Sequence, residues 1–259
     1  MKNLIHPFKT VFLMALVCFS SVVIGAQPVK NSNLAPGSVH TIGHSSGLHT
    51  SSVLLYNQYN TYTVGIASQD FEAGYDMVDC KGADDFVVPA GKKWSIDEIS
   101  IGATYGGTFP SPTVNFNVQF LEDNGGSPGA LIEEFLNVSV NSTNFLSNGI
   151  IPLPSPVLLD EGTKWISVQF RYDFTGYGQS FWSGSSVQVT NDAMWINPAG
   201  GFGMGTGWIS SQVISSNILD LQFALYGIES NTVPFPLLGS VIGFLVIGIA
   251  SFFGLRRKK

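Results

Sequence analysis

Apolar side chains recur at every second position in several short stretches of this chain, and this alternation restricts the possible fold more than any other feature. It occurs at 113–120, 165–172 and 218–225. Successive side chains of a strand point to opposite faces of a sheet, so the pattern indicates half-buried β-strands. Turn-forming residues separate the strands at 123–129, 152–156 and 198–201. With no long helical period between them, the sequence predicts an all-β domain, an antiparallel β-sandwich of the jelly-roll kind.

Both ends of the chain are typical of an exported protein. A basic start, an apolar run and small residues ending at Ala26 predict a signal peptide over 1–26. The uncharged stretch 237–255 is long enough for a transmembrane helix. A basic stop-transfer cluster follows it, formed by Arg256, Arg257, Lys258 and Lys259. This order predicts a cytoplasmic C-terminus and an exported domain outside the inner membrane.

The chain between these ends divides into three parts. Residues 27–52 are rich in Ser, Gly and Asn and predict a linker, and residues 53–229 carry the strand pattern of the sandwich. A spacer at 230–236 leads to the apolar stretch and ends in a short proline motif, formed by Val233, Pro234, Phe235 and Pro236.

The tail as a whole resembles the PEP-CTERM sorting signal of Gram-negative bacteria, in which a proline motif, one apolar helix and a basic cluster follow one another. In that family the motif is usually V-P-E-P, and Phe235 stands here in place of the glutamate. The resemblance implies an exosortase-like enzyme that cuts at the motif and releases the protein to the cell surface or medium. The alternative is a permanent single-span membrane anchor.

The exported part also resembles a recurrent bacterial cell-surface domain, from Leu54 to about Gly227. The matching segments are SQDFEA at 68–73, ADDFVVPAG at 83–91, DNGGSPGA at 123–130, GTKWISVQF at 162–170, WINPAGGFG at 195–203 and DLQFALYG at 220–227. The resemblance implies a secreted β-sandwich that occurs with different anchoring tails, and it implies no catalytic activity.

Charge and cysteine content limit the possible partners and cross-links. The formal net charge is −6, and no stripe of Lys and Arg occurs before the last residues, so we expect no nucleic-acid partner. Cys80 is the only cysteine left once the signal peptide is removed, which excludes a disulfide within the mature chain.

The segment HTIGHSSGLH, with His40, His44 and His49, approaches the spacing of a metzincin zinc site. Thr41 stands where the catalytic glutamate is needed, and the glycines disfavour the required helix. We therefore interpret the segment as part of the linker. No histidine follows His49, which disfavours Ser-His-Asp and Cys-His catalysis in the sandwich.

Six carboxylates lie within the sixteen residues 70–85. Oxygen ligands from irregular loops are those that Ca²⁺ prefers, so a structural Ca²⁺ is one interpretation of this stretch. Its candidate ligands are Asp76, Asp79, Asp84 and Asp85. The alternative is a solvated acidic loop whose aspartates form turns. No other cofactor is expected.

The tryptophans suggest a second kind of site. Trp165 alternates with polar residues, and three others lie among Gly, Ser and Asn, so exposed rings that stack on sugars are one interpretation. The candidates are Trp165, Trp182, Trp195 and Trp208. The alternative is that these rings close the ends of the sandwich and are buried.

Together these features predict a non-enzymatic surface or extracellular-matrix protein that adheres to, or weakly binds, extracellular polysaccharide. The alternative function is a secreted, glycosidase-like hydrolase with two carboxylates that meet in the fold. The adjacent pairs at 133–134 and 160–161 do not provide such a site by themselves, because neighbours on a strand face opposite ways.

Overall fold

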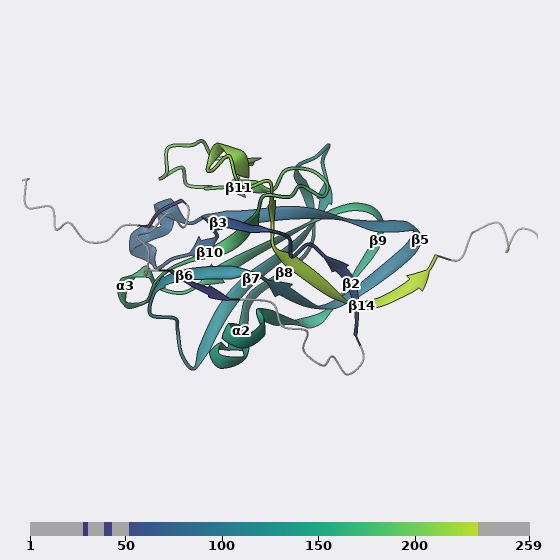
Figure 1. The fold of residues 1–259 in the computed structure, drawn as a ribbon, viewed down its shortest axis with the longest axis horizontal. Coiled ribbons are helices and arrows are strands. Elements are labelled where there is room, and N and C mark those ends of the chain that lie inside the picture. The colour runs from purple at the N-terminus through teal and green to yellow at the C-terminus, as the bar shows by residue number, and fades with distance from the viewer. Residues whose placement is uncertain (1–27, 31–38, 43–51, 233–259) are drawn as a thin grey trace, which may run out of the picture.

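The computed structural model describes residues 28–30, 39–42 and 52–232, and this part of the chain is mostly β-strand. Figure 1 shows the strands as extended antiparallel ribbons with short helical segments at their ends. The all-β prediction is therefore confirmed.

The elements follow one another without a long helix. In chain order they are β1 Val39–Ile42, β2 Val53–Asn57, β3 Tyr62–Ala67, β4 Gln69–Asp70, η1 Ala73–Val78, β5 Lys81–Ile101, β6 Ala103–Gly107, β7 Thr113–Asp123, β8 Pro128–Asn141, α2 Ser142–Asn148, β9 Ile150–Arg171, α3 Phe174–Tyr177, β10 Gly178–Ser185, β11 Met194–Ile196, β12 Ile209–Ser210, η2 Ser211–Val213, β13 Asp220–Leu221 and β14 Phe223–Asn231.

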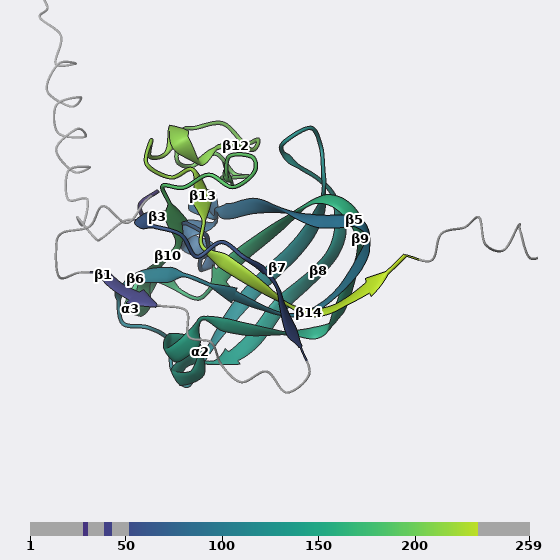
Figure 2. The same ribbon diagram turned by 45° about the vertical axis from the view of Figure 1, so that its right-hand side comes forward.

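The strands form a nine-stranded and a five-stranded sheet. In the larger sheet the order is β12-β11-β5-β9-β7-β8, with β14 along the second half of β5, β2 along β14, and β4 parallel to the end of β9. In the smaller sheet the order is β1-β6-β10-β13, and β3 also pairs with β10. Figure 2 shows the long strands β5, β7, β8 and β9 curving together around one side of the molecule.

One hydrophobic core joins the two sheets. Trp182 of β10 and Phe223 of β14 come from different sheets, and their ring centroids lie 6.1 Å apart. Phe116, Phe145 and Phe170 form a second aromatic group in the same core, with centroid separations from 4.8 to 5.8 Å. All five of these side chains are fully buried, so the alternating residues of both sheets supply the apolar interior.

The structure corrects two details of the predicted organisation. Part of the predicted linker is a strand, because Val39–Ile42 forms β1 and pairs antiparallel with β6. The predicted turn at 152–156 lies within β9, where Pro152 stands opposite Glu98 of β5. The predicted turn at 123–129 contains the connection between β7 and β8, and the one at 198–201 lies between β11 and β12.

Several predictions concern residues outside the described part. These are the signal peptide, most of the linker, the VPFP motif, the apolar stretch 237–255 and the basic cluster. Within the described part, no helix combines the length and the apolar character that crossing a membrane requires.

Candidate functional site

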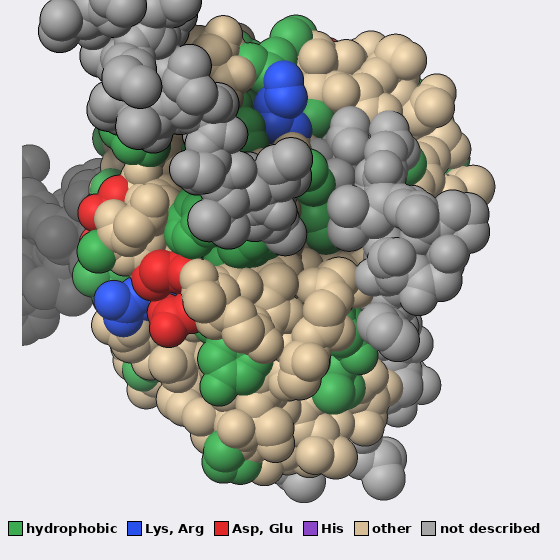
Figure 3. All heavy atoms as spheres, turned by 90° about the vertical axis from the view of Figure 1, so that its left-hand side faces the viewer, with side chains coloured by type: hydrophobic (Ala, Val, Ile, Leu, Met, Phe, Trp, Pro, Cys, Tyr) green, Lys and Arg blue, Asp and Glu red, His purple; other side chains and the backbone are tan. Residues whose placement is uncertain are grey.

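A polar groove of about 560 Å³ opens at the end of the molecule where η1, α3, the start of β7 and the end of β9 meet. Its charged lining is Asp70, Glu72, Asp76, Arg171 and Asp173, and its aromatic lining is Phe71, Tyr172 and Tyr177. Thr113 and Asn115 add a hydroxyl and an amide. The end that carries α3 faces the viewer in Figure 3, where acidic side chains lie beside a basic one. The volume lies within the range of about 300–1,000 Å³ typical of ligand pockets.

The base of the groove is fixed by an ion pair between two paired strands. Asp70 of β4 stands opposite Arg171 at the end of β9, and Arg171 Nε lies 3.1 Å from Asp70 Oδ2. The same oxygen accepts a hydrogen bond from Asn117 Nδ2 at 2.9 Å. A second guanidinium nitrogen donates to Asn137 of β8. Arg171 is therefore held by protein partners on two sides.

The wall of the groove is held by Glu72, which joins η1 to α3. Its carboxylate accepts the backbone N–H of Phe174 at 2.6 Å and that of Thr175 at 3.0 Å. Partial burial opposes the ionised form, but these hydrogen bonds outweigh it and lower the pKa of Glu72. Phe174 also packs against Phe71 and Tyr75, with ring centroids 6.1 and 5.3 Å apart. The groove is thus formed by side chains with defined positions.

Two carboxylates of the groove face solvent. Asp76 and Asp173 are exposed, and neither side chain forms a hydrogen bond or ion pair with another residue of the described ranges. Tyr177, which is 38% exposed, lies beside Tyr172 with the rings at 83° to each other. The groove therefore presents carboxylate oxygens next to accessible aromatic surface.

The candidate ligands for Ca²⁺ lie in separate surroundings. Asp76 and Asp79 belong to the η1 segment, where Asp79 Oδ1 accepts the backbone N–H of Phe71 at 2.8 Å. Burial, with the charges of Asp70 and Asp76 adding to it, raises the pKa of Asp79 to about 6. Asp84 and Asp85 follow each other in β5 and point to opposite faces of the sheet.

Asp84 and Asp85 are engaged in hydrogen bonds that join distant parts of the chain. Asp84 Oδ2 accepts from Gln58 Nε2 at 2.5 Å and from the backbone N–H of Leu221 at 2.6 Å. Asp85 accepts from Asn191 Nδ2 at 2.7 Å, from the Asn191 backbone N–H at 3.1 Å and from the Thr190 hydroxyl. These bonds hold β13 and the segment after β10 against β5.

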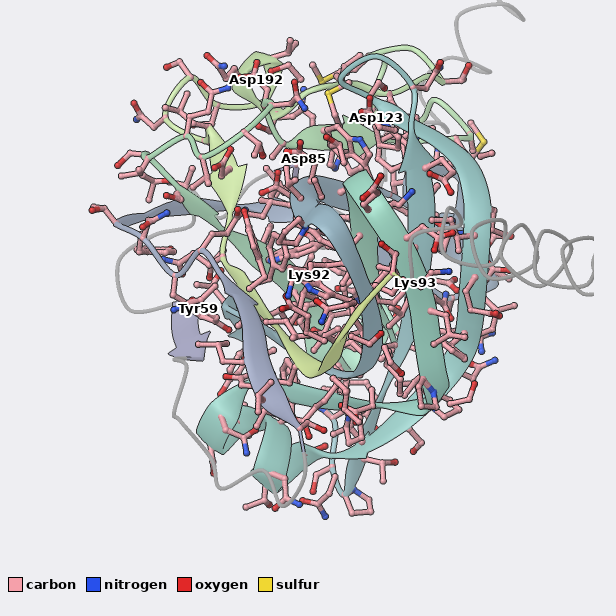
Figure 4. All side chains as sticks on the ribbon, turned by 90° about the vertical axis from the view of Figure 1, so that its right-hand side faces the viewer. Tyr59, Asp85, Lys92, Lys93, Asp123 and Asp192 are labelled. Carbon is pink, nitrogen blue, oxygen red and sulfur yellow. The ribbon has the colours of Figure 1, made fainter. Side chains whose placement is uncertain are left out.

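A third buried carboxylate, Asp220 of β13, completes this cluster. Its Oδ2 accepts the backbone N–H of Val189 at 2.6 Å, and its Oδ1 is buried without a hydrogen-bond partner. Burial and the Asp220 charge raise the pKa of Asp84 well above its ordinary value. Figure 4 shows Asp85, Asp123 and Asp192 at the same end of the molecule, away from Lys92 and Lys93.

The four candidate ligands do not meet in a common metal site. Among the described residues, no three His, Cys, Asp or Glu side chains are arranged so that they would hold a metal ion. Carboxylate oxygens of Asp79, Asp84 and Asp85 already accept hydrogen bonds from protein donors. The structural Ca²⁺ therefore stays a prediction.

Three of the four candidate sugar-binding tryptophans have no exposed ring. Trp165, Trp182 and Trp195 are fully buried, and each indole N–H donates inside the protein, at 2.8–2.9 Å. The expectation that these three rings are exposed is therefore wrong, and the alternative that they are buried holds for them. Trp165 does face away from the main core, but Met194 and Trp208 cover it. Trp208 itself is partly buried.

Sequence reasoning missed the groove and the role of Asp220. Arg171 lies 101 positions from Asp70, and Asp84 accepts from a backbone N–H 137 positions away. Such pairs leave no local spacing signal. The available hint is that Asp70, Glu72 and Asp76 fall within the acidic stretch, but nothing in that stretch points to the distant segments that complete the groove.

Comparison with protein-family models, with curated proteins and with solved structures gave no match to this chain. The assignment of function therefore depends on the geometry of the groove and on the sequence features.

Proposed function

We propose that this protein is an exported, non-enzymatic surface or extracellular-matrix protein whose jelly-roll-like β-sandwich binds polysaccharide in the groove beside η1 and α3. The observation that carries the proposal is the combination of exposed Asp76, Asp173 and Tyr177 around one open cavity. Sugars are recognised by polar groups that bond their hydroxyls and by aromatic rings that contact their apolar faces. The groove replaces the buried tryptophans as the candidate binding surface.

Export and processing belong to the same proposal. A signal peptide over 1–26 directs the chain outward, and an exosortase-like enzyme processes it near Pro234. Before processing, or without it, the apolar stretch 237–255 holds the protein in the inner membrane with the sandwich outside. A binding domain released in this way would associate with polysaccharide at the cell surface.

Binding is favoured over hydrolysis because two of the four carboxylates that line the groove are engaged by the protein itself. A glycosidase needs a carboxylic acid that keeps its proton near neutral pH and faces the substrate. Asp79 has a raised pKa, but it does not line the groove. Asp70 is paired with Arg171, and Glu72 holds two backbone N–H groups. We therefore propose a binding role rather than the alternative hydrolase.

Calorimetric titration of the mature protein with a panel of polysaccharide fragments tests the proposal. The variant Tyr177→Ala removes accessible ring surface, and we expect it to weaken binding about fivefold or more, since an aromatic contact contributes about 1 kcal/mol. The variant Tyr62→Ala is the matched control, because Tyr62 is similarly exposed, at 43%, but lies in β3 outside the groove. Binding of no fragment, or equal loss in both variants, would contradict the proposal.

A further inference from the structure

The charge of the groove is unbalanced. Its lining contains the carboxylates of Asp70, Glu72, Asp76 and Asp173 but only one cationic side chain, Arg171. That guanidinium is paired with Asp70 and also bonded to Asn137, so it does not offset the remaining carboxylates. A ligand entering the groove therefore meets a negative potential.

The unbalanced carboxylates differ in what they do for the fold. Glu72 is bonded to the backbone of α3, so its oxygens are partly satisfied by the protein. Asp76 of η1 and Asp173, which directly precedes α3, are exposed and border the cavity, and neither side chain forms a hydrogen bond or ion pair with another described residue. Their oxygens are thus available to a ligand without breaking any contact of the described structure.

We propose that the groove selects a polysaccharide with free amino groups, such as a glucosamine polymer, and this inference rests on the proposed function. An ammonium group would form charge-assisted hydrogen bonds with Asp76 and Asp173, while Tyr177 contacts the apolar face of the ring. A uronic-acid polymer would place carboxylates against these aspartates, and like charges in contact disfavour a wrong partner. An N-acetylated polymer would keep the ring contact but lose the charge.

The test compares oligomers of glucosamine, N-acetylglucosamine and galacturonic acid by calorimetry at about pH 6, below the ordinary pKa of an amino group. We expect the glucosamine oligomer to bind most tightly and the galacturonate oligomer not to bind. Asp76→Asn and Asp173→Asn should each weaken glucosamine binding about two- to fivefold, as expected for an exposed charge pair. Glu133→Gln is the control, because Glu133 is an exposed acid of β8 that does not line the groove.

The outcomes separate the inference from the proposed function. Binding of none of the three oligomers, nor of any other glycan, would overturn both. Equal or tighter binding of the acetylated or acidic oligomer, with Tyr177→Ala still weakening it, would overturn the amine selectivity alone. If Asp76→Asn and Glu133→Gln weaken binding of the glucosamine oligomer equally, the oligomer is attracted unspecifically to a negatively charged protein. This result would also overturn the amine selectivity.

Discussion

Asp220 shows how this fold tolerates a buried acid. The side chain is buried, one oxygen is bonded to the Val189 backbone, and the other has no hydrogen-bond partner. Burial is the main cause that raises its pKa, and the charges of Asp85 and Asp192 add to it against the hydrogen bond from Val189. A carboxyl in such surroundings is less costly when it keeps its proton.

Replacing this acid should change how stability depends on pH. The raised pKa means that the folded state holds the proton more tightly than the unfolded chain. This contribution to stability is full below the ordinary carboxyl pKa and is lost as the pH rises through the raised value. In chemical unfolding, we expect the free energy of unfolding of the wild type to fall between about pH 4 and pH 7. In the variant Asp220→Asn this decline should be smaller by about 1 kcal/mol.

Asp160 provides the control for this prediction, because its pKa is shifted in the opposite direction to that of Asp220. Asp160 is exposed, and its hydrogen bond and charge pairing with Lys93 lower its pKa, so Asp160→Asn should leave the decline between these pH values in place. If Asp220→Asn keeps the full decline, the buried Asp220 does not cause it.

The buried tryptophans lead to a second prediction at this scale. Trp182 is fully buried and its indole N–H bonds to the Gln222 carbonyl, whereas Trp208 is only partly buried. Truncation to alanine should cost about 3–5 kcal/mol at Trp182 and clearly less at Trp208. Urea unfolding measures both values, and equal costs would contradict the assigned burial.

The same tryptophans show that the direction of a side chain can be predicted from the sequence, whereas its burial cannot. The alternation correctly placed Trp165 on the face opposite Ile166 and Val168. It did not reveal that Met194 and Trp208, far along the chain, cover that face. Side-chain direction follows from local periodicity, whereas burial depends on distant segments that no local pattern specifies.

At the scale of elements, α2 is a short helix whose ends are defined by specific residues. The Asn141 side chain accepts the backbone N–H of Asn144 at 3.1 Å, which caps the start of the helix. Gly149 ends it in the left-handed region with φ 69°, and a Cβ there would lie 2.4 Å from the Ile101 carbonyl oxygen. Both the backbone conformation and the contact with β5 thus require glycine.

Gly149→Ala should therefore lower the free energy of unfolding by about 3 kcal/mol, because the variant adds a backbone clash to the strain of a positive φ. Gly125 provides the matched control, since its φ is 68° but a Cβ there would meet nothing within 4 Å. We expect Gly125→Ala to cost about 1 kcal/mol in the same urea experiment. Equal costs at both positions would mean that the close approach to Ile101 is not part of the folded state.

The element boundaries show where sequence patterns mislead. Prolines at 152, 154 and 156 predicted a turn, yet they lie in the half of β9 that pairs only with β5, whereas β7 pairs with residues 164–171. Proline is compatible with a strand where its missing N–H would face an unpaired side. The alternation at 113–120 had no such conflict, and β7 covers it completely.

At the scale of the whole molecule, the proposed processing predicts the mass of the mature protein. Mass spectrometry of the intact protein from the cell surface and the medium should show loss of 1–26 and of the segment after about Pro234. The loss of the C-terminal segment is expected because the tail resembles the PEP-CTERM sorting signal, which is cut at its proline motif. A mass that retains 237–259 would instead support a permanent membrane anchor.

The most direct test of the account is a nuclear magnetic resonance titration of the mature domain with the glycan that binds best. The account predicts that the amide shifts which change with saturation cluster at the groove, in η1, α3, the start of β7 and the end of β9. Amides at the start of β8, which pairs with the far end of β7 at Leu121 and Asp123, should not respond. Changes centred on another surface, or no changes at saturating glycan, would contradict the claim that this groove binds polysaccharide.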